Sequence, residues 1–204
     1  MQCLVTGATG FIGRALCREL IDSGHTVHAT SLRGGAVTDG LDARALDLGN
    51  GQLPAHLFDN VSTVFHLAGI AHQSAGPALY DAVNERGTVA LALAASAAGV
   101  RRFVYLSSVK AMGPATGDEP RGEEDATPAP DPYGSSKARS ERALREALAG
   151  DAMAVYILRP ALVFGPGVKG NLARLARAVA RGLPRPPEGG RRSMIARQDL
   201  VALM

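Results

Sequence analysis

Short apolar runs alternate with amphipathic stretches along most of the chain, and the two patterns predict alternating strands and helices. Apolar runs predict strands at residues 3–5, 26–30, 45–48, 61–67, 102–107 and 155–158. Apolar residues at helical spacing predict helices that begin after residue 10, near residue 82 and near residue 133. This alternation is typical of an α/β fold with a doubly wound parallel sheet that helices cover on both faces.

The first predicted strand leads directly into a glycine-rich turn that opens the first helix. Gly7, Gly10 and Gly13 recur at every third position of this turn. In a strand–turn–helix unit, such glycines allow a tight turn, a close approach of backbone to phosphate, and close packing of helix on strand. The N–H groups and the dipole of the helix then favour a bound pyrophosphate. Glycine turns also end strands for structural reasons alone, but the strand before and the helix after favour a dinucleotide site.

Composition narrows the function classes. The 204 residues carry a formal charge of +3, aromatic residues are few, and apolar positions and prolines separate the arginines near the C-terminus. We therefore expect no nucleic-acid partner. Cys3 and Cys17 fall in the first predicted strand and helix, where cysteines act as buried apolar residues, so we expect no disulfide. No apolar run reaches membrane-spanning length. We therefore expect no signal peptide, no membrane contact and a cytoplasmic protein. The acidic cluster from Glu119 to Asp125 lacks the spacing of a metal-binding loop, so we expect no metal.

Polar side chains at two points are candidates for acid–base chemistry. Tyr133 and Lys137 lie four residues apart at the start of a predicted helix, and therefore on one face of it. A tyrosine ordinarily titrates near ~10, and a neighbouring ammonium lowers its pKa and makes it a better proton shuttle. Ser107 and Ser108 end a central strand, at the sheet edge where ligands bind. A surface Tyr–Lys pair, and serines that only cap a turn, are the alternatives at this point.

Six motifs follow one another in a recognisable order, at residues 6–13, 66–69, 84–88, 107–108, 133–137 and 159–167. Their sequences are TGATGFIG, HLAG, NERGT, SS, YGSSK and RPALVFGPG. Together they resemble the extended short-chain dehydrogenase/reductases, specifically the NAD-dependent epimerase/dehydratase family, over nearly the whole chain. The resemblance implies a Rossmann fold, an NAD or NADP cofactor, and an enzyme that transfers a hydride.

The resemblance also implies roles for the matching residues. Tyr133 would be the acid/base, Lys137 would lower its pKa and bind the nicotinamide ribose, and Ser108 would hydrogen-bond the reacting sugar oxygen. The implied cofactor-binding residues are Gly7, Thr9, Gly10, Phe11, Ile12, Gly13, Arg33, Asp47, Leu48, Leu67, Ala68, Gly69, Asn84, Tyr133, Lys137 and Pro160. The implied substrate-binding residues are Ser108, Asn171 and Arg192, the last two near the nucleotide diphosphate.

Two departures from the family pattern bear on specificity. The acidic residue that binds the adenosine ribose would fall at residues 30–32, where this sequence has no carboxylate, and Arg33 follows. Because a guanidinium can bind a 2′-phosphate, we expect NADP to be slightly favoured over NAD. Leu162 stands where many relatives have asparagine, so one polar substrate contact is missing.

We expect residues 1–165 to form the NAD(P)-binding Rossmann domain. Residues 166–204 would begin a substrate-binding region that is largely missing, because residues 199–204 resemble the first turns of a helix whose apolar positions have no later partner. The chain also resembles a bacterial subgroup that acts at C4 of UDP-sugars. This implies a UDP-sugar substrate, a 4-epimerase or 4-keto reductase activity, and a homodimer. The alternative is a non-catalytic NAD(P)-binding sensor or assembly protein on the same fold.

Overall fold

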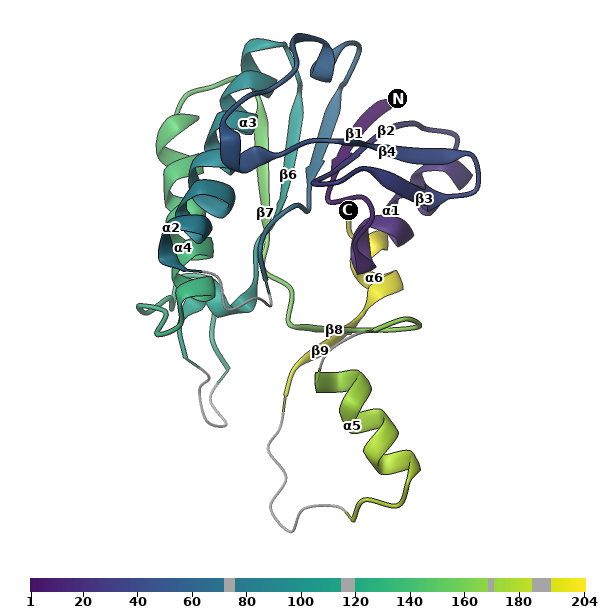
Figure 1. Cartoon of the computed structure of the whole chain (residues 1–204). Helices are drawn as coiled ribbons and strands as arrows, with labels where there is room; N and C mark the ends of the chain where they lie inside the picture. The colour runs from purple at the N-terminus through teal and green to yellow at the C-terminus, as the bar shows by residue number, and fades with distance from the viewer. Residues whose placement is uncertain (72–75, 115–119, 169–170, 185–191) are drawn as a thin grey trace.

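The computed structural model describes residues 1–71, 76–114, 120–168, 171–184 and 192–204 (Figure 1). A seven-stranded sheet has the strand order β3-β4-β2-β1-β5-β6-β7. The strands are β1 (Gln2–Thr6), β2 (Thr26–Ser31), β3 (Gly35–Thr38), β4 (Leu41–Ala45), β5 (Thr63–His66), β6 (Arg102–Leu106) and β7 (Ala154–Leu158). Among the strands in the described part of the chain, β3 and β4 form the one antiparallel pair of this sheet. Because β1 is central and the chain extends from it in both directions, the sheet is doubly wound, as predicted.

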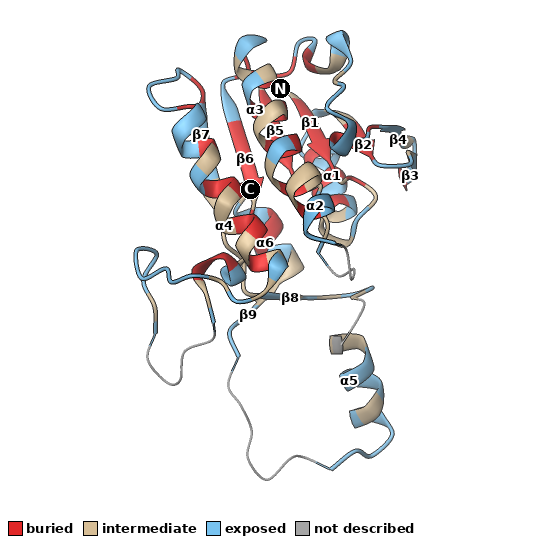
Figure 2. Ribbon diagram, turned by 60° about the vertical axis from the view of Figure 1, so that its left-hand side comes forward, coloured by how far each residue is buried: buried red, intermediate tan, exposed pale blue. Residues whose placement is uncertain are grey.

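Helices cover both faces of the sheet (Figure 1). The helices are α1 (Phe11–Asp22), α2 (Pro77–Tyr80), the π-helix η3 (Asp81–Arg86), α3 (Gly87–Ala97), α4 (Pro132–Ala147), α5 (Asn171–Ala180) and α6 (Arg197–Ala202). Strand β1 shows how the sheet serves both layers. Its Cys3 and Val5 belong to the core with α1 and α6, whereas Leu4 belongs to the core with α3 and α4. The near-continuous burial of β1 is that of a parallel strand covered on both sides (Figure 2).

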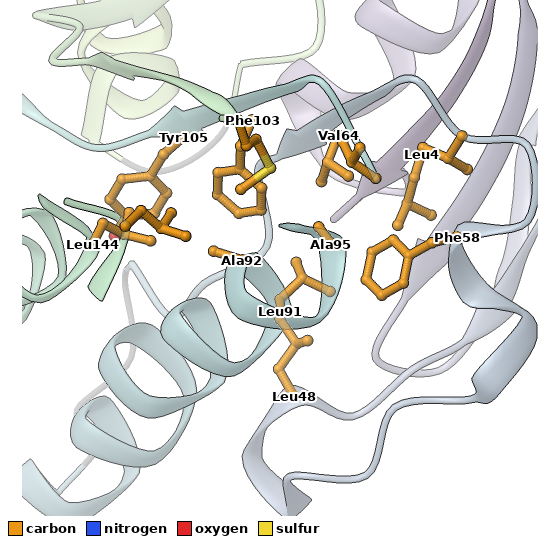
Figure 3. Packing of buried hydrophobic residues seen from close by; sticks show 14 of the residues in the cluster. Leu4, Leu48, Phe58, Val64, Leu91, Ala92, Ala95, Phe103, Tyr105 and Leu144 are labelled. Atoms are coloured by element: carbon orange, nitrogen blue, oxygen red, sulfur yellow. The ribbon is translucent and has the colours of Figure 1, made fainter. Parts of the chain in front are cut away.

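The core under α3 and α4 supports the strands that end at the candidate site (Figure 3). Phe103 and Tyr105 of β6 are fully buried there, and Leu144 of α4 packs in the same cluster. On α3, Ala92 and Ala95 are also fully buried. Since small residues let a helix approach a sheet closely, the alanine-rich sequence of α3 fits its place against the central strands.

The predicted strand at residues 45–48 is misplaced. The structure instead has the hairpin of β3 and β4, which ends at Ala45, and a single 3-10 turn, η1 (Leu48–Asn50). The Asp47 side chain accepts a hydrogen bond from the Gly49 amide at 2.8 Å and so begins this turn. Leu46 and Leu48 are buried in the core although neither belongs to a strand, and their apolar side chains therefore gave a strand-like pattern.

The last part of the chain adds a second, two-stranded parallel sheet of β8 (Leu162–Phe164) and β9 (Met194–Ala196). Helix α5 lies beyond it, away from the large sheet (Figure 1). Helix α6 returns to α1, and its Leu200 and Val201 are buried. The partner of this helix is therefore α1, a segment that comes earlier in the chain, which agrees with the expectation that its apolar positions have no later partner. A domain division after residue 165 stays a prediction. Across the described residues, no helix is both long and apolar enough to cross a membrane.

Candidate active site

The glycine turn after β1 has the geometry that its sequence predicts. Gly7 adopts a φ of +68°, and a Cβ there would lie 2.7 Å from the Ala68 amide nitrogen. A Cβ on Gly13 would overlap the Gly7 carbonyl oxygen and lie 2.8 Å from the Ala8 Cα. Gly10 begins α1 without a side-chain cap, and no acidic residue occupies the first turn. This N-terminus therefore fits an anion such as a pyrophosphate, for which Thr9, Phe11 and Ile12 would supply neighbouring backbone.

Arg14 stabilises the glycine turn through two hydrogen bonds, a role that the sequence analysis did not predict. Its Nε donates to the Thr9 carbonyl at 3.0 Å, and its Nη1 donates to the Val37 carbonyl of β3 at 2.7 Å. The arginine therefore ties the glycine turn to the edge hairpin. Its position directly after Gly13 gave no signal of this role, because the acceptor on β3 is distant in sequence.

A buried histidine joins the ends of β1 and β5 to α3. His66 Nδ1 lies 2.7 Å from Thr6 Oγ1, and its Nε2 lies 2.8 Å from Thr88 Oγ1. Thr6 Oγ1 in turn accepts the Ala68 amide at 3.2 Å. Burial lowers the pKa of His66 to about 3, and the nearby Lys137 acts in the same direction. A neutral imidazole thus fixes the Leu67–Ala68–Gly69 segment beside the glycine turn.

Asn84 lies at the same edge of the sheet, fully buried in η3. Its Oδ1 accepts the Ile70 amide at 2.8 Å, and its Nδ2 donates to the Ile70 carbonyl at 3.1 Å and to Ser136 Oγ at 2.9 Å. These bonds clamp the segment after β5 to α4. The side chain is thereby engaged with the protein, and direct cofactor binding by Asn84 stays a prediction.

Ser108 and Tyr133 are brought together from β6 and α4. Helix α4 begins beside the site because Asp131 Oδ1 accepts the Gly134 amide at 3.0 Å and Pro132 occupies its first turn. Ser108 follows β6, and its Oγ also accepts the Lys110 amide at 3.2 Å. Burial raises the pKa of Tyr133, and the neighbouring Ser108 hydroxyl acts in the opposite direction. The Tyr133 phenol is therefore protonated at neutral pH.

Lys137 lies one turn further along α4, and its side chain is buried. Its Nζ donates to the Leu106 carbonyl at 2.9 Å and lies 4.6 Å from the centre of the Tyr105 ring. Burial lowers the pKa of Lys137 to about 7, against the attraction of Glu141. The expected lowering of the Tyr133 pKa by Lys137 is not found, because burial of the phenol dominates and Nζ is turned to the end of β6.

The remaining predicted residues lie around this centre to different degrees. Asp47 is exposed and caps η1, whereas the Leu48 side chain is buried in the core. Arg33 is exposed in the turn after β2. The Pro160 carbonyl accepts the Val109 amide at 3.0 Å, beside Ser108. Arg192 is exposed before β9, and the Asn171 side chain lies outside the described residues. The ligand-binding roles of these residues stay predictions.

Comparison with known proteins places the chain in a family. The model of the NAD dependent epimerase/dehydratase family matches residues 3–204. UDP-glucose 4-epimerase of Vibrio cholerae is 36% identical over 98% of this chain and 64% of its own length. A 2-alkyl-3-oxoalkanoate reductase of Stenotrophomonas maltophilia is 34% identical over 89% of this chain and 57% of its own. The chain belongs to this family of extended short-chain dehydrogenase/reductase enzymes, as its motifs imply, and it spans under two thirds of these curated relatives.

Solved structures agree with the fold. MoeE5 in complex with UDP-glucuronic acid and NAD is 34% identical, with a TM-score of 0.83 over 99% of this chain and 70% of that one. Thermus thermophilus UDP-glucose 4-epimerase in complex with NAD is 28% identical, with a TM-score of 0.84 over 99% of this chain and 72% of that one. Both of these relatives hold NAD, so the expected slight preference for NADP finds no support here.

Among the described residues, no group of histidine, cysteine and acidic side chains could hold a metal ion. The sequence analysis missed one buried cluster beside the site, formed by Ser107, Glu141 and Arg159. Glu141 lies four residues after Lys137, and therefore on the same face of α4. That spacing, with an arginine directly before Pro160, is the signal that could have pointed to the cluster.

Proposed function

We propose that this protein is an NAD-dependent UDP-sugar 4-epimerase, which oxidises C4 of the sugar and reduces it again on the other face. The observation that carries the proposal is the convergence of Ser108, which lies close enough to Tyr133 to lower its pKa, with Tyr133 and the buried Lys137. This group stands at the carboxyl edge of the sheet, where the glycine turn also lies, which is the edge at which open α/β sheets bind ligands. Support for the substrate comes from relatives that are named as UDP-glucose 4-epimerases.

The dinucleotide would supply the hydride chemistry when bound. The glycine turn would hold its pyrophosphate on the N-terminus of α1, and Lys137 would hold the nicotinamide ribose. Tyr133 would move the proton at the C4 oxygen. Ser108 would hydrogen-bond the same oxygen and keep it within reach of the phenol. Asn171 and Arg192 would contact the diphosphate of the substrate, for which a planar guanidinium is well suited.

A 4-keto reductase is the second candidate, because Ser108, Tyr133 and Lys137 serve both reactions. The missing carboxylate after β2 favours it, since a weaker hold on the adenosine ribose suits a cofactor that exchanges after each turnover. A non-catalytic sensor would need the glycine turn but has no use for the Ser108–Tyr133–Lys137 group. A homodimer stays part of the proposal.

Stoichiometry distinguishes these candidates. Whole protein with bound NAD is incubated separately with UDP-glucose, UDP-galactose and their N-acetyl counterparts, and the products are separated by chromatography. In a second assay, whole protein receives a UDP-4-keto sugar together with NADH or NADPH. Interconversion of a C4 pair without net formation of NADH supports the epimerase. Consumption of one NADH or NADPH for each UDP-4-keto sugar reduced supports the reductase. Cofactor binding without turnover of any of these sugars would contradict both and support the sensor.

A further inference from the structure

A buried carboxylate lies behind the candidate catalytic group. The Glu141 side chain on α4 is only 2% exposed, yet it accepts hydrogen bonds from two side chains and forms an ion pair with a third. Ser107 Oγ donates to Glu141 Oε1 at 2.5 Å. The guanidinium of Arg159 forks over the carboxylate, with Nε at 3.1 Å from Oε1 and Nη2 at 2.6 Å from Oε2. Arg145 approaches from the solvent side, with Nη2 at 3.6 Å from Oε2.

The partners of this carboxylate are the neighbours of predicted site residues. Ser107 directly precedes Ser108 at the end of β6, and Arg159 directly precedes Pro160 at the end of β7. Backbone bonds join the same two segments, because the Ser107 amide donates to the Leu158 carbonyl at 2.8 Å. A single side chain of α4 therefore holds the ends of two strands against the helix that carries Tyr133 and Lys137.

A buried ion pair is an unusual means of holding these segments. Desolvation of two charges offsets much of their attraction, and apolar replacements of such pairs are often neutral or stabilising. Directional bonds fix distances between groups more closely than apolar packing does. The pair therefore suits a place where geometry matters more than stability.

We propose that Glu141 is a positioning residue, which with Arg159 and Ser107 fixes Ser108 relative to Tyr133 and Lys137. The inference rests on the proposed function, since it assigns a purpose to the spacing of that catalytic group. Glu141 does not contact the reacting atoms in this account. It acts through Ser107 on one side and through its own helix on the other.

The charge of Glu141 has a second consequence for Lys137. The groups that face this lysine are His66 from β5, Tyr105 from β6, and Glu141 from its own helix. Burial lowers the Lys137 pKa, and Glu141 is the group that acts against this. Removal of the Glu141 charge should therefore lower the Lys137 pKa further, whereas removal of the Ser107 hydroxyl should not change it.

Three variants of the whole protein test the inference. Ser107→Ala removes one bond and leaves the ion pair intact, and Glu141→Gln removes the charge at constant size. Arg145→Ala is the matched control, because its ion pair with Glu141 comes from a side chain that is 57% exposed. The measurements are kcat and KM for the UDP-sugar, NAD affinity, and the titration of Lys137 by carbon-13 lysine NMR.

We expect kcat to fall by about tenfold or more in Ser107→Ala and Glu141→Gln, with KM and NAD affinity within about threefold of wild type. Arg145→Ala should keep the wild-type kcat. The Lys137 titration should move to lower pH only in Glu141→Gln. The inference is overturned if folded Ser107→Ala keeps the wild-type kcat. It is also overturned if Arg145→Ala loses as much kcat as Ser107→Ala and Glu141→Gln do. Should Glu141→Gln fail to fold, Ser107→Ala decides alone.

The same design separates the two proposals. A wild-type protein that turns over no UDP-sugar contradicts the proposed function, and the inference that rests on it falls with it. A wild-type protein that turns over UDP-sugar, together with a folded Ser107→Ala variant of unchanged kcat, contradicts the inference alone.

Discussion

Replacement of Lys137 by methionine should change how the stability of the protein depends on pH. The side chain is 4% exposed, and burial lowers its pKa from 10.5 to about 7. Between pH 7 and pH 9 the unfolded chain therefore keeps a proton on this lysine that the folded protein releases. Stability rises with pH wherever the unfolded state binds more protons. The wild-type protein should thus gain stability from this residue on going from pH 7 to pH 9, and should lose it again as the pH falls.

The size of the effect follows from the two pKa values. Linkage gives a gain of about 2 kcal/mol from Lys137 between pH 7 and pH 9. Burial also raises the pKa of Cys3 and Cys17, which lowers stability toward alkaline pH in both proteins and cancels in their difference. The lost hydrogen bond to the Leu106 carbonyl costs Lys137→Met about 1–3 kcal/mol, but equally at both pH values.

Urea unfolding of wild type and Lys137→Met at pH 7, 8 and 9 measures this difference. We expect the free energy of unfolding of wild type to gain about 2 kcal/mol relative to the variant across this range. If the difference in the free energy of unfolding between wild type and Lys137→Met stays constant within about 0.5 kcal/mol from pH 7 to pH 9, the folded protein holds Lys137 protonated throughout this range. That result would refute the argument from burial.

Three further predictions use other parts of the site. Because burial lowers the His66 pKa to about 3, wild type should lose about 2 kcal/mol of stability from pH 6.5 to pH 4.5, and His66→Gln should flatten this slope in urea titrations. Gly13→Ala should cost about 1–3 kcal/mol in thermal unfolding and weaken NAD binding, since its Cβ would meet backbone, whereas the open Gly76→Ala should change stability by less than about 0.5 kcal/mol. Arg33 is exposed in the turn after β2, where its guanidinium could reach a 2′-phosphate that NAD lacks, so Arg33→Ala should weaken NADP and leave NAD affinity within about threefold by calorimetry. Equal losses for the two cofactors would contradict this prediction.

Five of the seven strands of the central sheet were predictable from short, largely apolar segments between turns. β1, β2, β5, β6 and β7 all lie where those segments fall. The hairpin of β3 and β4 was not predictable, because residues 35–45 carry only Val37 and Leu41 as larger apolar residues, each isolated among small and polar ones. Its pairing depends on contacts with β2 and on the turn at Gly40, whose φ is +75°.

Some features of the candidate site were also predictable from the sequence, and others were not. Local sequence predicted the glycine turn and the four-residue spacing of Tyr133 and Lys137, and the edge rule for parallel sheets placed Ser108 beside them. The protonation of these groups was not predictable, because the pKa of Lys137 depends on how deeply tertiary packing buries it. Glu141 was missed for a related reason. An isolated acidic residue on a helix reads as solvated until the strand ends that cover it are known.

The central claim is that Tyr133 moves the proton of a sugar hydroxyl while bound dinucleotide takes the hydride. Its most direct test mixes whole protein that holds NAD with UDP-glucose or UDP-N-acetylglucosamine and follows transient NADH absorbance together with C4 epimer formation. Tyr156→Phe is the matched control, since Tyr156 is 52% exposed on β7. We expect Tyr133→Phe to abolish both signals with NAD affinity within about threefold, and Tyr156→Phe to keep them. Epimer formation by Tyr133→Phe at a rate near that of wild type would contradict the account.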